Sequence, residues 1–385
     1  MVERLPVRSV RASVDCIPLG EALTTVASEW EALRERSPAA SPFASWAWHQ
    51  AWAAAAVAED LDTSRTVLLR GATGAVEAIL PLAIRSTPFR RERVTALTWA
   101  IGDVGCPDHL DIPALPGADF DAVLPVLTSL PWDVAILSNL APGSANATRL
   151  AAALLRGGCA VRWQEQWACP YIELPGSWEE YLGSLSPSRR QALRRRERAL
   201  HRAHPVTLTD YDSDTLDTGW QHLVALHARR WADDGGGVFA DPRIERLHRA
   251  FAAELARREQ LWLTTLDVNG EPTAAWYGFA DRDTVYFYQS GRDPRRDDLS
   301  VGAVLMAHMI RRSIERGYRR FDFLRGEEAY KLQWTALRRM TGQFVAFRPG
   351  WRGQWLRGLD LASRLWARLR PRRRGHGSPP APAAA

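Results

Sequence analysis

The second half of the chain alternates apolar and polar residues in a way that predicts a meander of three β-strands. Residues 260–267 and 273–280 are expected to pair, because Asn269-Gly270 between them is a dipeptide typical of hairpin turns. A third strand is expected over 284–290. Alternation divides its side chains between two faces, one with Thr284, Tyr286, Tyr288 and Ser290, the other with Val285, Phe287 and Gln289.

Apolar residues at helical spacing surround this meander. They predict helices over 217–231, 241–258 and 300–317, and strands over 206–211, 320–324 and 341–347. The first half shows the same mixture: helices over 23–36, 119–127 and 147–156, a turn entering a helix over 41–52, and strands over 66–70, 75–85, 94–100, 132–137 and 160–174. The fold class expected from this order is α/β (α+β), with helices flanking mixed sheets.

The chain has 385 residues, of which 46% are hydrophobic, so it is long enough for two domains. We expect an N-terminal domain over 1–170, a C-terminal domain over 171–350 and a tail over 351–385. A very basic helix with Ser188 as its N-cap follows the first boundary. It is either a solvated linker or a surface for a polyanion, with Arg189, Arg190 and Arg194 as the best phosphate ligands.

Several classes of protein are disfavoured by composition. The longest apolar runs are too short for a transmembrane helix, and the first 20 residues lack the apolar core of a secretory signal. The four cysteines form no pair with metal-ligand spacing, which predicts no metal site and a reducing, cytoplasmic location. The net charge of +6 belongs to the tail, since residues 351–385 hold eight Arg and one Asp, a sum of +7.

The most unusual stretch follows the strand expected over 320–324. Lys331 is the single lysine among the 50 Lys and Arg residues, which suggests a task that a guanidinium group cannot perform, although chance remains the alternative. Asp322, Arg325, Glu327 and Tyr330 lie within nine residues of it. Ligand sites in α/β folds lie where strands end and loops begin, so this stretch is the first candidate for the functional site.

A second candidate is the start of the helix expected over 300–317. Ser300-Val301-Gly302 opens it with small residues, which would let a pyrophosphate reach the free backbone N–H groups at the positive end of the helix dipole. Close packing and ordinary capping would also explain these residues.

These segments together resemble the BioF2/CelD-like branch of the GNAT acyltransferase superfamily, to which the Fem-type aminoacyl transferases are related. The residues that carry the resemblance are Gly291-Arg292-Asp293-Pro294, Ser300-Val301-Gly302, Glu315-Arg316-Gly317, Phe321 to Lys331, Trp334, Ser188-Arg189-Arg190, Leu193-Arg194-Arg195, Leu226-His227, Arg230-Trp231, Gly270 to Ala275 and the cluster Trp46, Trp48 and Trp52. The glycine-rich loop of typical acetyltransferases is only partly present, since Ser300-Val301-Gly302 keeps one glycine.

The resemblance implies two tandem GNAT-like domains, each with a mixed, mostly antiparallel sheet, the first degenerate as a cofactor site. It also implies acyl transfer from acyl-CoA, with acetyl-CoA as one option, to an amine or hydroxyl of a small molecule, sugar or envelope precursor. Expected catalytic residues are Glu327, Lys331, Asp322 and Tyr288. Expected cofactor-binding residues are Ser300, Val301, Gly302, Arg189 and Arg190. Expected substrate-binding residues are Arg325, Tyr330, His227, Arg230, Trp231, Trp46 and Trp48.

Glu327 is the first choice as general base, with Asp322 or His227 second, and Tyr288 or Tyr330 would protonate the leaving group. Structural roles compete with these: an ion pair of Glu327 with Arg325 or Lys331, and core packing of the tryptophans. A Fem-like transferase that uses aminoacyl-tRNA is the alternative enzyme, and a non-catalytic membrane-associated scaffold is the alternative of another class. No DNA partner is expected.

The tail alternates apolar and basic positions at helical spacing. Its apolar positions are Trp351, Trp355, Leu359, Ala362, Trp366 and Leu369, and its basic ones include Arg352, Arg357, Arg364, Arg368 and Arg370. A Trp-bearing basic amphipathic helix can lie in an anionic membrane interface. We therefore expect peripheral contact with the inner face of the membrane through 351–374, or packing of this helix on the protein's own body.

Overall fold

The computed structural model describes residues 12–37 and 41–369, which form two compact units. The first unit holds the described residues up to Gln166 and those from Met340 onward, and the second is Trp167–Arg339. Residues 340–350 therefore join the first unit, whereas the sequence placed them at the end of the C-terminal domain. The reason is that β12 (Arg338–Phe347) pairs with β5 (Val134–Leu140) of the first unit.

The first unit is built on a sheet with the strand order β1-β2-β3-β4-β5-β12-β6. The strands expected over 66–70 and 75–85 form an antiparallel hairpin, in which Val67 pairs with Leu80. Its further elements are β1 (Ser13–Pro18), α1 (Leu19–Thr25), α2 (Ala27–Arg36), η1 (Pro42–Ala44), α3 (Trp46–Ala55), α4 (Ala58–Asp62), β2 (Ser64–Arg70), β3 (Val76–Phe89), β4 (Glu92–Trp99), α5 (Leu124–Ser129), α6 (Ala145–Arg156), β6 (Ala160–Glu173) and α12 (Trp351–Leu369).

The second unit is built on a sheet with the order β6-β11-β10-β9-β8-β7. The meander is confirmed: β8 pairs with β9 and β9 with β10, all antiparallel. The elements are α7 (Trp178–Ser184), α8 (Pro187–Ala203), β7 (Val206–Asp210), α9 (Leu216–Arg230), η2 (Ala232–Asp234), η3 (Val238–Ala240), α10 (Pro242–Arg257), β8 (Leu261–Val268), β9 (Glu271–Asp281), β10 (Thr284–Arg292), η4 (Pro294–Leu299), α11 (Val301–Glu315), β11 (Arg320–Asp322) and η5 (Lys331–Gln333).

The sheet of each unit includes a short parallel pair of strands among antiparallel pairs. In the second unit β10 and β11 pair over three residues, 284–286 with 320–322, and α11 connects them. In the first unit β4 and β5 pair over 96–98 with 134–136, and the six-residue α5 lies in the connection. The expected fold class, two similar α/β units with mixed and mostly antiparallel sheets, is confirmed.

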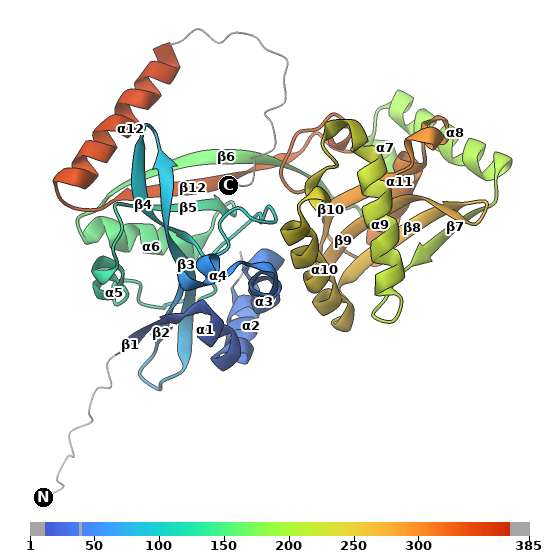
Figure 1. The fold of residues 1–385 in the computed structure, drawn as a ribbon. Coiled ribbons are helices and arrows are strands. Elements are labelled where there is room, and N and C mark those ends of the chain that lie inside the picture. Colours follow the sequence, from blue (N-terminus) through green and yellow to red (C-terminus); the bar gives the residue numbers. More distant parts are fainter. Residues whose placement is uncertain (1–11, 38–40, 370–385) are drawn as a thin grey trace, which may run out of the picture. The chain divides into compact units, whose positions relative to one another are not determined.

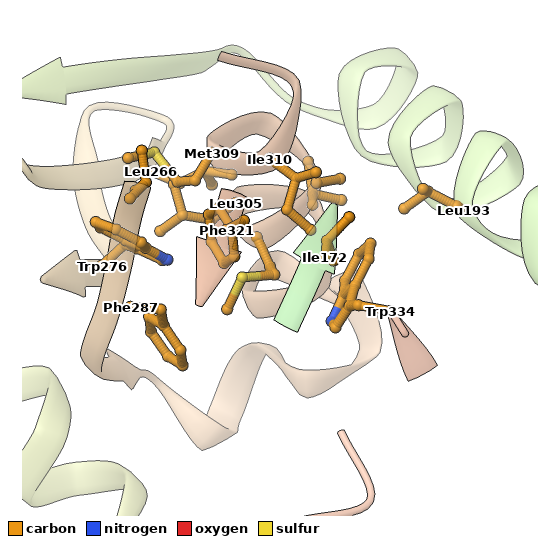
Figure 2. Packing of buried hydrophobic residues seen from close by; sticks show 14 of the residues in the cluster. Ile172, Leu193, Leu266, Trp276, Phe287, Leu305, Met309, Ile310, Phe321 and Trp334 are labelled. Carbon is orange, nitrogen blue, oxygen red and sulfur yellow. The ribbon is translucent and has the colours of Figure 1, made fainter. Parts of the chain in front are cut away.

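Helices cover both faces of the second unit's sheet, with α9 and α10 on one face and α8 and α11 on the other (Figure 1). Alternation along β9 sends Trp276 into the α11 face and Tyr277 into the α9 face, and both rings are buried. Figure 2 shows Trp276 and Phe287 gathered with Leu305 and Met309 of α11. Full burial of such a side chain stabilises the fold by roughly 1.5–3 kcal/mol.

Two sequence expectations differ from the structure at helix and strand ends. The cap of α8 is Ser186, whose Oγ accepts a hydrogen bond from Arg189 N at 3.4 Å, because Pro187 lacks an N–H and suits the first helical position better than Ser188 does. The strand expected over 320–324 ends at Asp322, because the Asp322 carboxylate accepts the Leu324 N–H at 2.8 Å and turns the chain.

A β-bulge in β10 corrects the faces that alternation assigned. The register with β9 shifts between Phe287 and Gln289, so Tyr288 is the extra residue. Ser290 consequently pairs with Trp276 on the α11 face, while Tyr288 stays with the cluster under α9. The bulge thus moves Ser290 to the face opposite the one that the sequence pattern predicted.

Candidate functional site

The second unit has a cavity of about 250 Å³ beside the end of β10, beyond the residues that pair with β11. The parallel pairing ends at Tyr286 and Asp322, while β10 continues to Arg292. The cavity is lined by Arg230, Ala275, Trp276, Ser290, Gly291, Arg292, Gly302, Ala303, Leu305, Met306, Tyr330, Gln333 and Trp334. It therefore joins the end of a sheet strand to the first turns of α11 and to the segment around Lys331.

The start of α11 forms one wall of this cavity. Ser300 precedes the helix in the left-handed region with φ +55°, and its side chain makes no capping hydrogen bond. The first N–H groups of α11, at Val301 and Gly302, are thus left without a side-chain cap. Gly302 lines the cavity, and Arg292 lies beside it in an ion pair with Asp297 at 2.7 Å. A negatively charged group is favoured at such a helix start.

Arg230 connects the cavity with the end of α9. Its Nη1 donates to Ser290 Oγ at 2.7 Å, and its guanidinium lies over the rings of Trp231 and Tyr330, 5.1 and 5.3 Å from their centroids. Burial raises the pKa of Tyr330, and the nearby Lys331 charge opposes that shift only in part. Tyr330 is therefore a protonated phenol at neutral pH, held against a fixed cation at the cavity wall.

His227 lies behind the cavity wall, with 1% of its surface exposed. Its Nδ1 lies 3.1 Å from the Ser290 carbonyl oxygen, so Nδ1 carries the proton and Nε2 the lone pair. Desolvation lowers the pKa of His227 to about 4, although the hydrogen bond to Ser290 opposes the shift. Within the described residues, His227 Nε2 and Trp231 Nε1 are buried with no hydrogen-bond partner.

Gly237 packs closely against these two side chains. It has φ +75°, and a Cβ added there would lie 2.4 Å from His227 Nε2 and 2.8 Å from Trp231 Cδ1. Both distances are too short for atoms in contact, so only glycine fits at position 237. His227 and Trp231 therefore pack behind the cavity wall, and neither is among the residues that line the cavity.

The low pKa of His227 predicts acid destabilisation. Between pH 4 and 6.5 the unfolded chain binds a proton at this residue that the folded chain does not, so the free energy of unfolding rises with pH there. The slope from one such group is at most about 1.4 kcal/mol per pH unit. Urea denaturation across this window should show a shallower slope for His227→Gln, and the same slope as the parent for His201→Gln on the exposed face of α8. An equal slope in His227→Gln would contradict a neutral buried imidazole.

Lys331 is buried, with 5% exposure, and holds the loop that leads to Tyr330. Its Nζ donates to the Arg325 carbonyl oxygen at 2.6 Å and pairs with Glu328 at 3.0 Å. A compact ammonium can make both contacts inside one turn of chain, whereas a planar guanidinium would need more room. Lys331 is therefore a positioning residue for the cavity wall, and it does not line the cavity itself.

Three other expected site residues make structural contacts outside the cavity lining. Glu327 is exposed and pairs with Arg338 at 3.0 Å, which favours the ion-pair interpretation, although the partner is neither Arg325 nor Lys331. Asp322 is fully buried and pairs with Arg339. Tyr288 packs against the His248 ring at 4.1 Å.

The remaining expected residues lie on other surfaces. Arg189 is exposed and Arg190 is half-buried on α8, and Arg325 lies over the Trp167 ring at 5.7 Å. Trp46 and Trp48 belong to the first unit, where Trp48 is fully buried against Phe43 and Trp46 Nε1 donates to the Leu23 carbonyl oxygen. Their geometry favours core packing.

The cavity also contains residues that the sequence did not single out. Ser290 was missed because the bulge reverses its face, and Gln333 because nothing local marks it. Ala303 and Met306 could have been found, because they lie one and four positions after Gly302 and so share a face of α11 with it or border that face.

The sequence of the second unit matches a known family. Residues 187–332 match the model of the acetyltransferase (GNAT) domain. They belong to the GNAT superfamily. This GNAT domain spans α8 to η5, so it includes β10, β11, α11 and the loop held by Lys331. No curated protein matches the chain in sequence.

Solved structures share the fold over nearly the whole chain. FemX superposes with a TM-score of 0.55 at 12% identity, covering 86% of this chain and 98% of FemX. The C-terminal domain of a putative lysylphosphatidylglycerol synthetase from Agrobacterium fabrum gives 0.51 at 10% identity, covering 89% of this chain and 97% of that one. L-PGS from Bacillus licheniformis gives 0.50 at 10% identity, covering 88% and 96%. The expected relationship to Fem-type transferases is thus confirmed in fold.

Two other kinds of site are absent from the described residues. None of the helices in 12–37 and 41–369 is long and apolar enough to cross a membrane. Among the same residues, no group of three or more His, Cys, Asp or Glu side chains is placed to hold a metal ion.

Proposed function

We propose that the chain transfers an acyl group from acyl-CoA to an amine, or less often a hydroxyl, of a small molecule, sugar or envelope precursor. The observation that carries this proposal is the cavity beside the end of β10, beyond the residues that pair with β11, which reaches the uncapped start of α11 inside a GNAT domain. Acetyl-CoA is one donor of this class, and the BioF2/CelD-like branch is the proposed affiliation. The first unit is proposed to have no donor site, and the protein to work in the cytoplasm.

The wall residues suit thioester chemistry. The acceptor amine attacks the thioester carbonyl, a C–N bond forms, the C–S bond breaks, and Tyr330 supplies a proton to the departing sulfur. The ammonium formed on the acceptor loses its proton to solvent, and the Tyr330 phenolate recovers one. Arg230, fixed by Ser290, lies next to Tyr330 and stabilises the transient negative charge.

The acceptor is proposed to bind against the polar part of the cavity wall, which is formed by Arg230, Ser290 and Tyr330. The two hydroxyl groups can each donate or accept a hydrogen bond. An acceptor with both donors and acceptors, such as an amino sugar or an amino acid derivative, would suit this wall.

Isothermal titration with acetyl-CoA, a longer acyl-CoA and free CoA tests the donor site. The parent should bind at least one of them with micromolar affinity, and Gly302→Trp should weaken that binding about tenfold or more, because overpacking a site costs about 1–3 kcal/mol. The fold should survive, since an added Cβ at Gly302 meets only Arg292 Cδ at 3.5 Å. Gly183→Trp on α7 is the matched control, because space around Gly183 is open and it lies outside the cavity lining.

The outcomes separate the alternatives. If binding is lost in Gly302→Trp and kept in Gly183→Trp, the result supports a donor-binding site at the start of α11. Lys331→Met should keep most of the donor affinity, because Lys331 contacts the loop and does not line the cavity. No binding of any CoA species by the parent would overturn the proposal.

A Fem-like transferase that uses aminoacyl-tRNA is the second candidate. Residues of α8 that favour it are exposed arginines on successive turns: Arg189, Arg194, Arg195, Arg196, Arg198 and Arg202. Binding of tRNA through them should weaken steeply with salt. Failure to bind either CoA or tRNA would favour the non-catalytic scaffold.

A further inference from the structure

Helix α12 is tied to the body of the first unit along one face. Asp360, with 1% exposure, accepts from three guanidinium groups, those of Arg90, Arg162 and Arg364. Leu356 is fully buried in a cluster with Phe89, Val94, Val345 and Phe347. These contacts hold the helix in one orientation on the first unit. They therefore also determine which side of α12 is turned away from the body of that unit.

The opposite face of α12 is apolar and largely exposed. Trp351, Trp355 and Trp366 are 79%, 54% and 61% exposed, and Leu365 and Leu369 are 58% and 80% exposed. These five residues, together with Gly358 and Ala362, recur three or four apart and share one side of the helix. We name the five large side chains the α12 ridge. A monomer rarely exposes so many large apolar side chains in one row.

A groove with basic walls runs beside the ridge. Its volume is about 550 Å³, and it is lined by Leu155, Gly158, Cys159, Ala160, Val161, Arg162, Phe347, Gln354, Arg357, Leu361 and Arg364. Asp360 neutralises Arg162 and Arg364 in part, whereas Arg357 and Arg368 on the same flank are exposed. Leu155 and Leu361 are also exposed, at 58% and 44%, so the groove combines cations with apolar surface.

We propose that the α12 ridge inserts into the interfacial region of an anionic phospholipid bilayer, with lipid phosphates against Arg357 and Arg368. The charge supports a bilayer over a second protein: residues 351–385 carry eight Arg and one Asp. Tryptophan prefers the boundary between headgroups and acyl chains, and arginines beside it attract anionic lipid. The interaction is that of a helix lying in the membrane surface, and it is independent of the proposed acyl transfer.

Flotation of the full chain with vesicles tests this surface. Vesicles of phosphatidylcholine mixed with phosphatidylglycerol should carry the protein, vesicles of phosphatidylcholine alone should carry much less, and high salt should release it. Trp355→Gln with Trp366→Gln should weaken binding about tenfold or more, since each substitution removes apolar surface that the bilayer would bury. Arg357→Gln and Arg368→Gln should each weaken it about fivefold at low salt.

Matched controls keep the test specific. Trp163→Gln removes a tryptophan of the first unit that is 45% exposed but lies on β6, outside the ridge, and should leave flotation unchanged. The ridge residues are exposed, so thermal unfolding of the double variant should match the parent. A chain ending at Leu369 should still float, more weakly because four arginines are removed.

Several results would overturn the proposal. One is that the protein does not float with anionic vesicles at low salt. Another is that the variant lacking Trp355 and Trp366 floats as well as the parent. A third is that the parent binds neutral vesicles as strongly as anionic ones. Concentration-dependent dimers that disappear in the double variant, without vesicle binding, would show that a second copy covers the ridge instead.

Discussion

Tyr330→Phe is expected to lower kcat by at least about 100-fold and to leave donor affinity nearly unchanged. General acid catalysis of this kind contributes about 10²–10⁴-fold. Burial raises the pKa of the Tyr330 phenol, which therefore keeps its proton at neutral pH. Phe preserves the ring that lies under Arg230 and beside Phe287. The measurement is steady-state turnover together with donor titration, using the acyl-CoA that binds the parent.

Tyr318→Phe is the matched control for this result. Tyr318 packs against the Trp262 ring at 5.7 Å in the same hydrophobic cluster and lies outside the cavity lining. It should keep parental turnover. Turnover of Tyr330→Phe within a few-fold of the parent would mean that Tyr330 only packs, and that solvent protonates the leaving thiolate.

Asp360→Ala is expected to lower the free energy of unfolding by about 3–5 kcal/mol, which is typical when one partner of a buried ion pair is removed. The side chain of Asp360 lies between Arg90, Arg162 and Arg364, at 2.5, 2.7 and 3.0 Å. Without the carboxylate, three cations would face one another in a partly buried place. Urea denaturation followed by circular dichroism measures the change.

An exposed ion pair of the same unit provides the comparison. Asp121 pairs with Arg156 at 2.9 Å, but both side chains are about half exposed. Asp121→Ala should therefore cost no more than about 1 kcal/mol. If Asp360→Ala were as mild as Asp121→Ala, the three arginines would not depend on Asp360, and the orientation of α12 would need another cause.

Local patterns in the sequence predicted most of the elements. Asn269-Gly270 marked the hairpin between β8 and β9, and its residues adopt the positive φ angles, +56° and +83°, that such turns require. Asp241 was expected to begin α10, and its Oδ1 does accept the Arg243 N–H at 2.8 Å. These signals work because the interactions join residues a few positions apart.

Long-range pairings could not be predicted in the same way. Arg90 and Asp360 are 270 positions apart, and nothing near either residue indicates the other. The bulge at Tyr288 depends on how β9 and β10 fit together, so strict alternation placed Ser290 on the wrong face. The boundary at 339/340 likewise follows from the pairing of β12 with β5, which no local pattern marks.

The residues of the candidate site also fall into those that local sequence could predict and those that it could not. His227, Arg230 and Trp231 lie three and four positions apart on one helix, so sequence could group them, and Arg230 does line the cavity. Gly302 and Tyr330 also line it. Glu327 and Lys331 were chosen for their chemistry, yet each contacts a group just outside the cavity lining, which only coordinates could reveal.

The burial of Lys331 has a practical consequence for chemical labelling. It is the chain's single lysine, and its amine is enclosed by the Arg325 carbonyl and Glu328. Amine-reactive dyes, cross-linkers and acetylating reagents will therefore find no accessible lysine side chain while Lys331 keeps these two contacts. Lys331 can be modified only when residues 325–331 unfold locally. The rate at which a simple reagent acylates Lys331 therefore measures local unfolding at the cavity wall.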